Sequence, residues 1–175
     1  MKPLASPTTK LLIAVLFSDE ELLNAAKEKL HEKYGAIDFE SQRFDFAVSD
    51  YYKPEMGWPI YRLFWSFEEL INPKDIAPIK IECNEIEDQL AIQGKRKVNL
   101  DAGYLDYDKV VLASAKYNWQ KIYLDNGIYA DLTLRYEKGN YFPFPWSFPD
   151  FKEGHYNKML LRIRELYKQQ RKNKQ

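Results

Sequence analysis

Apolar residues recur along this chain with two spacings, one typical of strands and the other typical of helices. Residues 11–17 are apolar throughout, which indicates a buried strand in the middle of a sheet. Ser18 and Glu21 then form a capping box, so we expect a helix to begin here and to end near Gly35. Its apolar positions follow at helical spacing, namely Leu22, Leu23, Ala26, Leu30 and Tyr34.

A second helix is predicted after two more strands. Residues 37–48 alternate between apolar and polar, and residues 60–67 are also typical of a strand. The prolines and the glycine in residues 49–59 predict an irregular connection between them. Asn72 and Pro73 suit the first positions of a helix. Its apolar stripe comprises Ile76, Ile79, Cys83, Ile86 and Leu90, and Gly94 follows.

The remainder of the chain is typical of short antiparallel strands followed by one helix. The predicted strands are residues 98–100, 107–115, 121–125, 128–136 and 141–144. Asn126-Gly127 is a strong β-hairpin signal because both positions tolerate a positive φ. Residues 143–151 contain three prolines and are predicted to be irregular. The final helix is expected from about residue 153.

These elements predict an α+β fold. Its first part is a ferredoxin-like β-α-β-β-α-β arrangement, extended by an antiparallel β-meander, and the C-terminal helix packs on the sheet. The sequence has 175 residues and no internal repeat or linker, so we expect a single domain over residues 1–175. Its ends, residues 1–9 and 169–175, are expected to be flexible.

Composition narrows the classes of function. Lys plus Arg and Asp plus Glu number 26 each, so the formal net charge is zero, which argues against nonspecific nucleic-acid binding except through a local basic patch. Aromatic residues reach 15%, enough for a dense core or a ring-lined binding surface. The single cysteine, Cys83, excludes an intramolecular disulfide, and residues 11–17 are too few to span a membrane. We therefore expect a cytoplasmic protein that does not insert into membranes.

Complete catalytic signatures are missing from the sequence. It has no G-x-x-x-x-G-K-[ST] loop, no G-x-G-x-x-G motif and no G-x-S-x-G elbow. The only histidines, His31 and His155, lack the spacing of zinc ligands. The candidate chemistry therefore depends on carboxylates, amides, lysines and aromatic rings.

The first candidate site is the segment that contains Asn99 and Asp101. Alternation along a strand places these side chains on the same side, and Gly103 allows a turn or a close approach to a ligand. An amide and a carboxylate at a strand end could bind a cation or a sugar hydroxyl, or act as a general base. Both are therefore candidate catalytic residues, and Tyr104 is a candidate ligand-binding residue. The alternative is that Asn99 and Asp101 only build an Asx turn.

The second candidate site is the irregular loop of residues 50–57. Asp50 is a further candidate catalytic residue, and Tyr52 is a candidate ligand-binding residue because loops of fixed geometry often hold sites. Together with Asp101, the carboxylates of Asp50 and Glu55 would suit Mg²⁺ better than Zn²⁺, since hard ions prefer oxygen ligands. The alternative is that these acidic residues are solvated surface charges.

Four more residues are candidate ligand-binding groups. Lys116 follows an apolar strand and could neutralise a phosphate. Asp131 and Arg135 share the polar face of the strand predicted at residues 128–136, and Trp146 could form a pocket wall. Each has a structural alternative: a solvated residue after a strand, the wet face of an antiparallel sheet, or packing of the last helix.

Several segments taken together resemble one family. They are SDEELL, FDF, DYYKPEMG, FEELI, NLDAGYL, VLASAK, GIYADLTLRY and PWSFPDF. Over residues 10–167 the chain is similar to an uncharacterised prokaryotic family known as domain-of-unknown-function family 4416. The central motif of that family is typically NLDPGYL, so Ala102 stands where proline is usual, while Asn99, Asp101 and Tyr104 are kept. The resemblance implies a shared site without an established activity.

Two hypotheses for function follow from these patterns. The first is a protein that binds or acts on a phosphorylated or nucleotide-like small molecule. Its pocket would be a hollow at the rim of the sheet where the tyrosine-rich loop and the Asn99–Asp101 segment meet. The second is a non-catalytic module that binds RNA or a protein partner through an aromatic sheet face and the basic final helix.

Overall fold

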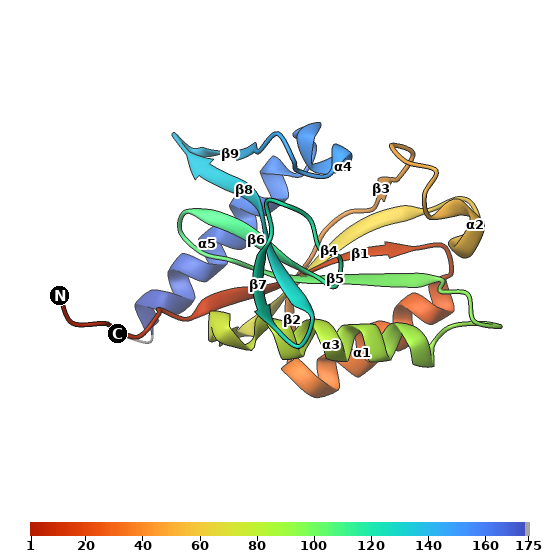
Figure 1. The fold of residues 1–175 in the computed structure, drawn as a ribbon, viewed down its shortest axis with the longest axis horizontal. Helices are drawn as coiled ribbons and strands as arrows, with labels where there is room; N and C mark the ends of the chain where they lie inside the picture. Colours follow the sequence, from red (N-terminus) through yellow and green to blue (C-terminus); the bar gives the residue numbers. More distant parts are fainter. Residues whose placement is uncertain (174–175) are drawn as a thin grey trace.

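Nine strands form one sheet in the computed structural model, which describes residues 1–173 (Figure 1). In chain order the elements are β1 (Thr9–Phe17), α1 (Glu20–Tyr34), β2 (Ile37–Glu40), β3 (Phe44–Asp45), α2 (Lys53–Met56), β4 (Tyr61–Ile71), a 3₁₀ turn (Pro73–Asp75), α3 (Ile76–Gln89), β5 (Val98–Leu105), β6 (Lys109–Ser114), β7 (Ile122–Asp125), β8 (Ile128–Glu137), β9 (Asn140–Pro143), α4 (Pro149–Lys152) and α5 (Asn157–Asn173). The strand order is β2-β4-β1-β5-β6-β8-β7, with β3 beside β4 and β9 beside β8.

The first two long helices each connect strands that have another strand between them. Helix α1 joins β1 to β2 across β4, and α3 joins β4 to β5 across β1. Every pairing between these strands is antiparallel. The predicted α+β class, with an antiparallel sheet and a C-terminal helix, is confirmed. The element order differs from the prediction because β3 and α2 lie between β2 and β4.

The side chains of β1 alternate between two cores. Leu11, Ile13 and Val15 pack with α1 and α3 on one face of the sheet, whereas Leu12 and Ala14 pack with α5 on the other. Figure 1 shows α1 and α3 together on one side and α5 crossing the opposite side. Burying a Leu, Ile or Val side chain contributes about 1.5–3 kcal/mol. Burial on both faces therefore explains why this strand is apolar throughout.

Strand β5 is longer than predicted, which changes the setting of the candidate residues. The strand predicted at residues 98–100 continues to Leu105 because β1 pairs with it along its whole length. Asn99 and Asp101 therefore lie within a strand, and the Asx-turn alternative is wrong. Their side chains share one face, as alternation predicts, while Leu100 packs in the core with α1 and α3.

Strand β8 contains a bulge that separates Arg135 from Asp131. In the pairing of β6 with β8, Val110 lies opposite Leu134, whereas Leu112 lies opposite Asp131. A step of two residues along β6 thus matches three along β8, which defines a β-bulge. Because Val110 and Leu112 share one face, Asp131 shares that face with Leu134. The prediction that Asp131 and Arg135 lie on a common face is therefore wrong.

Helix α1 begins one residue later than the capping box predicts. Asp19 is the N-cap residue, and its carboxylate accepts a hydrogen bond from the Leu22 amide at 3.0 Å. The hydroxyl of Ser18 instead donates to the carbonyl of Met56 at 2.6 Å. The predicted capping role of Ser18 is therefore wrong, because its hydroxyl connects α1 to the loop that contains α2.

Other predicted boundaries differ by short irregular elements. The strand predicted at residues 37–48 is divided into β2 and β3, and the irregular residues 49–59 contain α2. Residues 143–151 include the start of α4, and the final helix α5 begins at Asn157 rather than near residue 153. The hairpin at Asn126-Gly127 is confirmed, with positive φ angles of 51° and 77°.

Helix α5 contacts the segment that leads into β1, and both lie on the same side of the view in Figure 1. The hydroxyl of Tyr167 donates to the carbonyl of Thr8, and Arg171 donates to the Thr8 hydroxyl. The segment predicted to be flexible at the C-terminus is helical as far as Asn173, and Lys174 and Gln175 lie outside the described residues. Among residues 1–173, no helix has the length and apolar character needed to cross a membrane.

Candidate functional site

The sheet divides into two branches between β5 and β6. These strands pair only from Gly103–Leu105 to Val110–Leu112. On the N-terminal side of Gly103, β5 pairs with β1 but no longer with β6, whereas the rest of β6 pairs with β8. A Cβ atom at Gly103 would lie 2.3 Å from the Val111 carbonyl oxygen, so only glycine permits this close approach where the branches meet.

A hollow of about 350 Å³ lies in this fork, and we call it the polar hollow. Side chains of β5, α3, β8 and the segment after β6 line it, including Lys80, Arg96, Asn99, Asp101, Lys121 and Asp131. Cationic and anionic groups thus line the same space. Such an arrangement offers both donors and acceptors to a small molecule.

A second hollow of about 250 Å³ adjoins the first, and we call it the aromatic hollow. Its walls include the rings of Phe46, Tyr51, Tyr52, Phe148 and Phe151. Five residues line both hollows, namely Tyr52, Asp101, Leu112, Lys116 and Phe148. The two spaces therefore share a wall and form a polar and a ring-lined compartment side by side.

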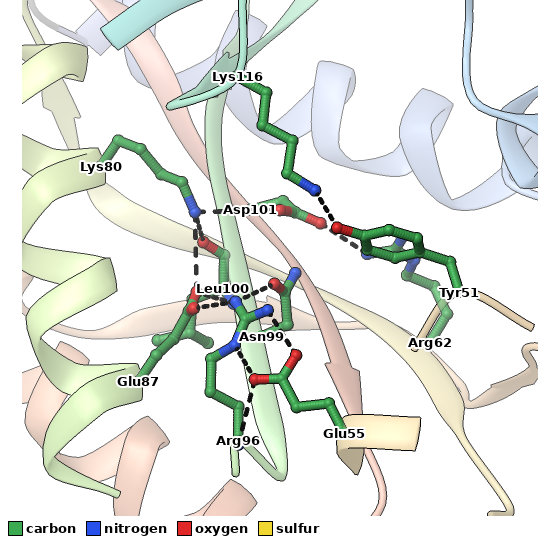
Figure 2. Close-up of polar contacts among 10 residues, drawn as sticks. All are labelled: Tyr51, Glu55, Arg62, Lys80, Glu87, Arg96, Asn99, Leu100, Asp101 and Lys116. Carbon is green, nitrogen blue, oxygen red and sulfur yellow. Dashed lines mark hydrogen bonds and ion pairs between the residues drawn. The ribbon is translucent and has the colours of Figure 1, made fainter. Parts of the chain in front are cut away.

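Helix α3 closes the edge of β5 that β6 leaves unpaired (Figure 2). The Glu87 carboxylate accepts from the Leu100 amide at 2.6 Å, and the Lys80 ammonium donates to the Leu100 carbonyl at 2.7 Å. Lys80 and Glu87 are only 6% and 3% exposed. They replace the strand partners that this part of β5 lacks, because buried backbone groups need hydrogen bonds.

Arg96 connects three elements at the base of the polar hollow. Its guanidinium binds both carboxylate oxygens of Glu55, at 2.6 and 2.8 Å, and donates to Glu87 at 2.7 Å. It also donates to the Asn99 side-chain oxygen at 3.0 Å (Figure 2). Hydrogen bonds from Arg96 lower the pKa of Glu55, whereas burial raises the pKa of Glu87.

Asp101 lies between two buried cations on the wall shared by the hollows. One carboxylate oxygen is 3.3 Å from the Arg62 guanidinium, and the other is 3.9 Å from the Lys80 ammonium. Arg62 also binds the buried Asp150 at 3.1 Å. Burial opposes the charge of Arg62, but Asp150 and Asp101 hold its pKa above the ordinary value. Asp101 is therefore fixed in position by its cationic partners.

Two residues that line the polar hollow each carry a buried side-chain atom without a hydrogen-bond partner among the described residues. These atoms are the side-chain nitrogen of Asn99 and one carboxylate oxygen of Asp131. Both residues are 4% exposed. The amide orientation of Asn99 is fixed because its oxygen accepts from Arg96. One free donor and one free acceptor thus belong to residues that line the same space.

The second oxygen of Asp131 lies near Lys121. Its distance from the Lys121 ammonium is 3.6 Å, and Lys121 also donates to the Ser114 hydroxyl and the Lys116 carbonyl at 2.9 and 3.1 Å. Burial raises the pKa of Asp131, although Lys121 acts in the opposite direction. The ammonium group of Lys121 therefore holds the turn after β6 against β8.

Tyr51 and Lys116 meet at the mouth of the hollows (Figure 2). The Lys116 ammonium donates to the Tyr51 hydroxyl at 2.6 Å and lies 4.4 Å from the centre of the Tyr51 ring. This hydrogen bond lowers the pKa of Tyr51. Both side chains are exposed, so a ligand could reach Lys116 from solvent.

Part of the predicted site is brought together by the fold. Tyr52, Asn99, Asp101, Lys116 and Asp131 all line the polar hollow. The tyrosine-rich loop and the Asn99–Asp101 segment therefore meet beside one hollow, and that prediction is confirmed. The hollow lies within the fork of the sheet rather than at a strand end, because β5 continues past the predicted turn.

Three predicted ligand-binding residues lie elsewhere. Tyr104 packs against the core with α1 and α3, since alternation places it on the face opposite Asp101. Arg135 is exposed and lies over the rings of Phe142 and Phe144. The third is Trp146: its indole nitrogen donates to the carbonyl of Leu132 at 2.9 Å, and its ring stacks on Phe144 at 4.9 Å.

The three carboxylates predicted to bind Mg²⁺ are not grouped. Asp50 is 80% exposed at its side chain and pairs with Lys53 at 2.5 Å, while Glu55 binds Arg96 and Asp101 binds Arg62. Within residues 1–173, no cluster of three or more His, Cys, Asp or Glu residues is placed to hold a metal ion. Each carboxylate has a separate cationic partner, so the predicted magnesium site is not formed.

Lys80, Glu87, Arg96 and Lys121 are among the charged residues of the site that escaped prediction from the sequence. Lys80 and Glu87 are seven residues apart and share the buried stripe of α3 with Ile76 and Cys83. Charged residues at the spacing of an apolar stripe are a signal that could have identified them. Arg96 and Lys121 precede β5 and β7, where the local pattern carries no such signal.

Residues 7–167 match the model of a family described as "Domain of unknown function (DUF4416)". The chain belongs to this family. The resemblance inferred from its motifs is thereby confirmed. The matched region includes every residue of the chain that lines the two hollows. Neither a curated protein nor a solved structure matches the chain significantly.

Proposed function

We propose that this DUF4416 protein binds a nucleotide-like or otherwise phosphorylated small molecule across the two hollows. A flat ring of the ligand would occupy the aromatic hollow, and its polar part would occupy the polar hollow. Lys116, at the mouth of both, would contact a phosphate group in place of Tyr51.

The observation that carries the proposal is the pair of adjoining hollows with one polar and one aromatic lining. Small-molecule sites are typically concave spaces of about 300–1,000 Å³ that combine apolar walls with a few placed polar groups. The polar hollow has about 350 Å³, and two of the residues that line it carry buried polar atoms that lack a partner. An unpaired buried polar group is costly, which supports a ligand that supplies the missing bonds.

The aromatic wall supports a ring-containing ligand. Tyr52 and Phe148 line both hollows, and Phe148 is 45% exposed. Aromatic side chains favour stacked or edge-on contacts with other rings. A ligand with a ring at one end and hydroxyl or phosphate groups at the other matches the order of the two compartments.

A thermal-shift panel tests the proposal directly. Nucleosides, nucleotides, sugar phosphates and divalent ions are each added to the full chain. A ligand at about 100 times its dissociation constant should add about 2.7 kcal/mol of stability, which raises the melting temperature by several degrees. Phe148→Ala should reduce the shift, while Phe142→Ala, a matched change outside both hollows, should retain it.

The outcome that contradicts the proposal is the absence of any shift across the nucleosides, nucleotides and sugar phosphates. Equal effects of Phe148→Ala and Phe142→Ala would also count against it, because the ligand would then bind elsewhere. A shift caused by divalent ions alone would contradict it too, since the carboxylates are separated by their cationic partners.

The alternative function is an interaction module, for which the sequence predicted an aromatic sheet face as the binding surface. The structure offers a different surface. Helix α5 covers the sheet face on which Leu12, Ala14 and Phe64 lie, so that face is not free for RNA or protein. Exposed apolar side chains instead gather at and before β7, including Tyr117, Trp119, Ile122 and Tyr123. This alternative predicts binding that is lost in Trp119→Ser and Tyr123→Ser but retained in Phe148→Ala, measured by gel shift with RNA.

A further inference from the structure

The cations around the polar hollow are already matched by groups of the protein itself. Lys80 binds Glu87, Asp101 and the Leu100 carbonyl, and Arg96 binds Glu55, Glu87 and Asn99. Lys121 has the Asp131 carboxylate, the Ser114 hydroxyl and the Lys116 carbonyl as partners. A phosphate placed inside this hollow would have to displace one of these sets of partners.

The two unpaired atoms of the hollow have opposite hydrogen-bonding roles. The Asn99 nitrogen can only donate, and the free Asp131 oxygen accepts when the carboxylate is ionised. A phosphate oxygen would be repelled by the Asp131 carboxylate, and an ammonium group would meet the donor of Asn99. Neutral groups that can both donate and accept, such as hydroxyls, suit both atoms.

We propose that the polar hollow takes the uncharged, hydroxyl-bearing sugar of a nucleoside-like ligand. Its hydroxyl groups donate to the free oxygen of Asp131 and accept from the nitrogen of Asn99. This inference rests on the proposed function and names the part of the ligand that enters the fork. The base lies in the aromatic hollow, and any phosphate stays at the mouth, beside Lys116.

The position of Lys116 supports this division of the ligand. Lys116 is exposed and its ammonium binds a neutral phenol, so it is the cation of this site that a phosphate reaches without breaking an ion pair. Lys80 and Lys121 are buried, with side chains 7% exposed. A phosphate held only by an exposed lysine adds little affinity, since surface ion pairs are weak.

The test is calorimetric titration of the full chain with adenosine, 2′,3′-dideoxyadenosine and adenosine 5′-monophosphate. Adenosine should bind at least about tenfold more tightly than the dideoxy compound, because a site built for hydroxyls is left with unpaired buried groups when they are missing. The monophosphate should bind within about threefold of adenosine.

Two nearly isosteric variants each reverse the hydrogen-bonding role of one unpaired atom. Asn99→Asp keeps an oxygen for Arg96 but replaces the free donor by an acceptor. Asp131→Asn can direct its oxygen to Lys121 and present a donor where an acceptor was. Each should remove most of the preference for adenosine over the dideoxy compound. Asp88→Asn and Asn126→Asp, the same chemical changes at exposed positions outside both hollows, should keep it.

The outcomes separate this inference from the proposed function. Equal binding of adenosine and the dideoxy compound overturns the sugar assignment while leaving a ligand in the hollows. Monophosphate binding more than about tenfold tighter than adenosine also overturns it, because the phosphate would then lie inside. If none of the three compounds binds, the sugar assignment fails, and the wider thermal-shift panel decides the proposed function. The comparison among ligands needs no variant, so a variant that fails to fold leaves the test intact.

Discussion

Glu87 binds three different kinds of group, namely a backbone amide, a guanidinium and an ammonium. Its carboxylate accepts from the Leu100 amide and from Arg96, and it lies 3.7 Å from the Lys80 ammonium. It is 3% exposed. Burial raises its pKa, so the ionised form depends on these partners to remain stable.

Removing the Glu87 carboxylate should be costly for stability. Glu87→Ala leaves the buried Leu100 amide without an acceptor and removes one anionic partner each from Lys80 and Arg96, and breaking a buried ion pair typically costs about 3–5 kcal/mol. Glu87→Gln keeps an oxygen for the amide and should cost less. Urea denaturation measures both, with Glu165→Gln on the exposed face of α5 as the control that should change little. Equal stability of wild type and Glu87→Ala would contradict the described network.

Asp131 should give stability a specific pH dependence. Burial raises its pKa above the ordinary value of about 3.9. A carboxyl group whose pKa is higher in the folded than in the unfolded state stabilises the fold when it is protonated, and this contribution is lost as pH rises through the folded-state pKa. Asp131→Asn has no ionisable group at this position, so it does not lose this stability as pH rises.

The measurement is urea unfolding of wild type and Asp131→Asn from about pH 3 to pH 7. Relative to wild type, the variant should become more stable as pH rises through the range in which Asp131 ionises. Parallel pH profiles of the two proteins would show that Asp131 titrates as an exposed aspartate, and would remove the argument that its free oxygen is buried.

At the scale of elements, the start of α1 depends on which residue caps the helix. The structure assigns the cap to Asp19, which accepts from the Leu22 amide. Asp19→Ala should therefore cost about 1 kcal/mol. Glu21→Ala should cost much less, because Glu21 would matter only in the capping box with Ser18. Thermal or urea unfolding compares them, and a larger effect of Glu21→Ala would reverse the assignment.

The fork between β5 and β6 depends on one glycine. Gly103→Ala would place a Cβ atom 2.3 Å from the Val111 carbonyl oxygen, and because backbone cannot move aside easily, the two strands must separate. We expect a loss of about 1–3 kcal/mol, as for other overpacked sites. We also expect faster hydrogen exchange at the Val111 and Leu112 amides. Unchanged stability and exchange would mean that the strands meet less closely than described.

Periodicity along the sequence predicted the elements whose burial is simple. The run of residues 11–17 became the central strand, and the stripe of α3 and the hairpin at Asn126-Gly127 were also predicted correctly. The extent of β5 was missed because local turn residues suggested an end, whereas pairing with β1 continues the strand. Neighbouring strands decide such cases, and their register is not visible in local sequence.

The candidate site was predictable where alternation alone sets side-chain direction. Asn99 and Asp101 were placed on a common face correctly, and the same rule puts Tyr104 on the opposite face. Arg135 was misplaced because the β-bulge in β8 reverses the alternation after Asp131. A bulge is defined by pairing with the partner strand, here β6, so the pattern within residues 128–136 alone does not reveal it.

At the scale of the whole molecule, the site is a consequence of one helix and a loop meeting a divided sheet. Helix α3 contributes Lys80 and Glu87 from one face, β5 contributes Asn99, and β8 contributes Asp131 from the other branch. The loop before α2 adds the tyrosine wall. The matched DUF4416 region, residues 7–167, contains all of these segments. If one molecule binds across this site, these segments, which are remote in sequence, should all respond to the same ligand.

Nuclear magnetic resonance titration of ¹⁵N-labelled protein with adenosine measures this directly. The side-chain amide of Asn99 and the backbone amides of Tyr52, Lys116 and Asp131 should all shift with a single dissociation constant. The side-chain amide of Asn126, in the exposed hairpin, should stay unchanged. An Asn99 side-chain amide that does not move while other resonances shift would contradict ligand binding in the fork.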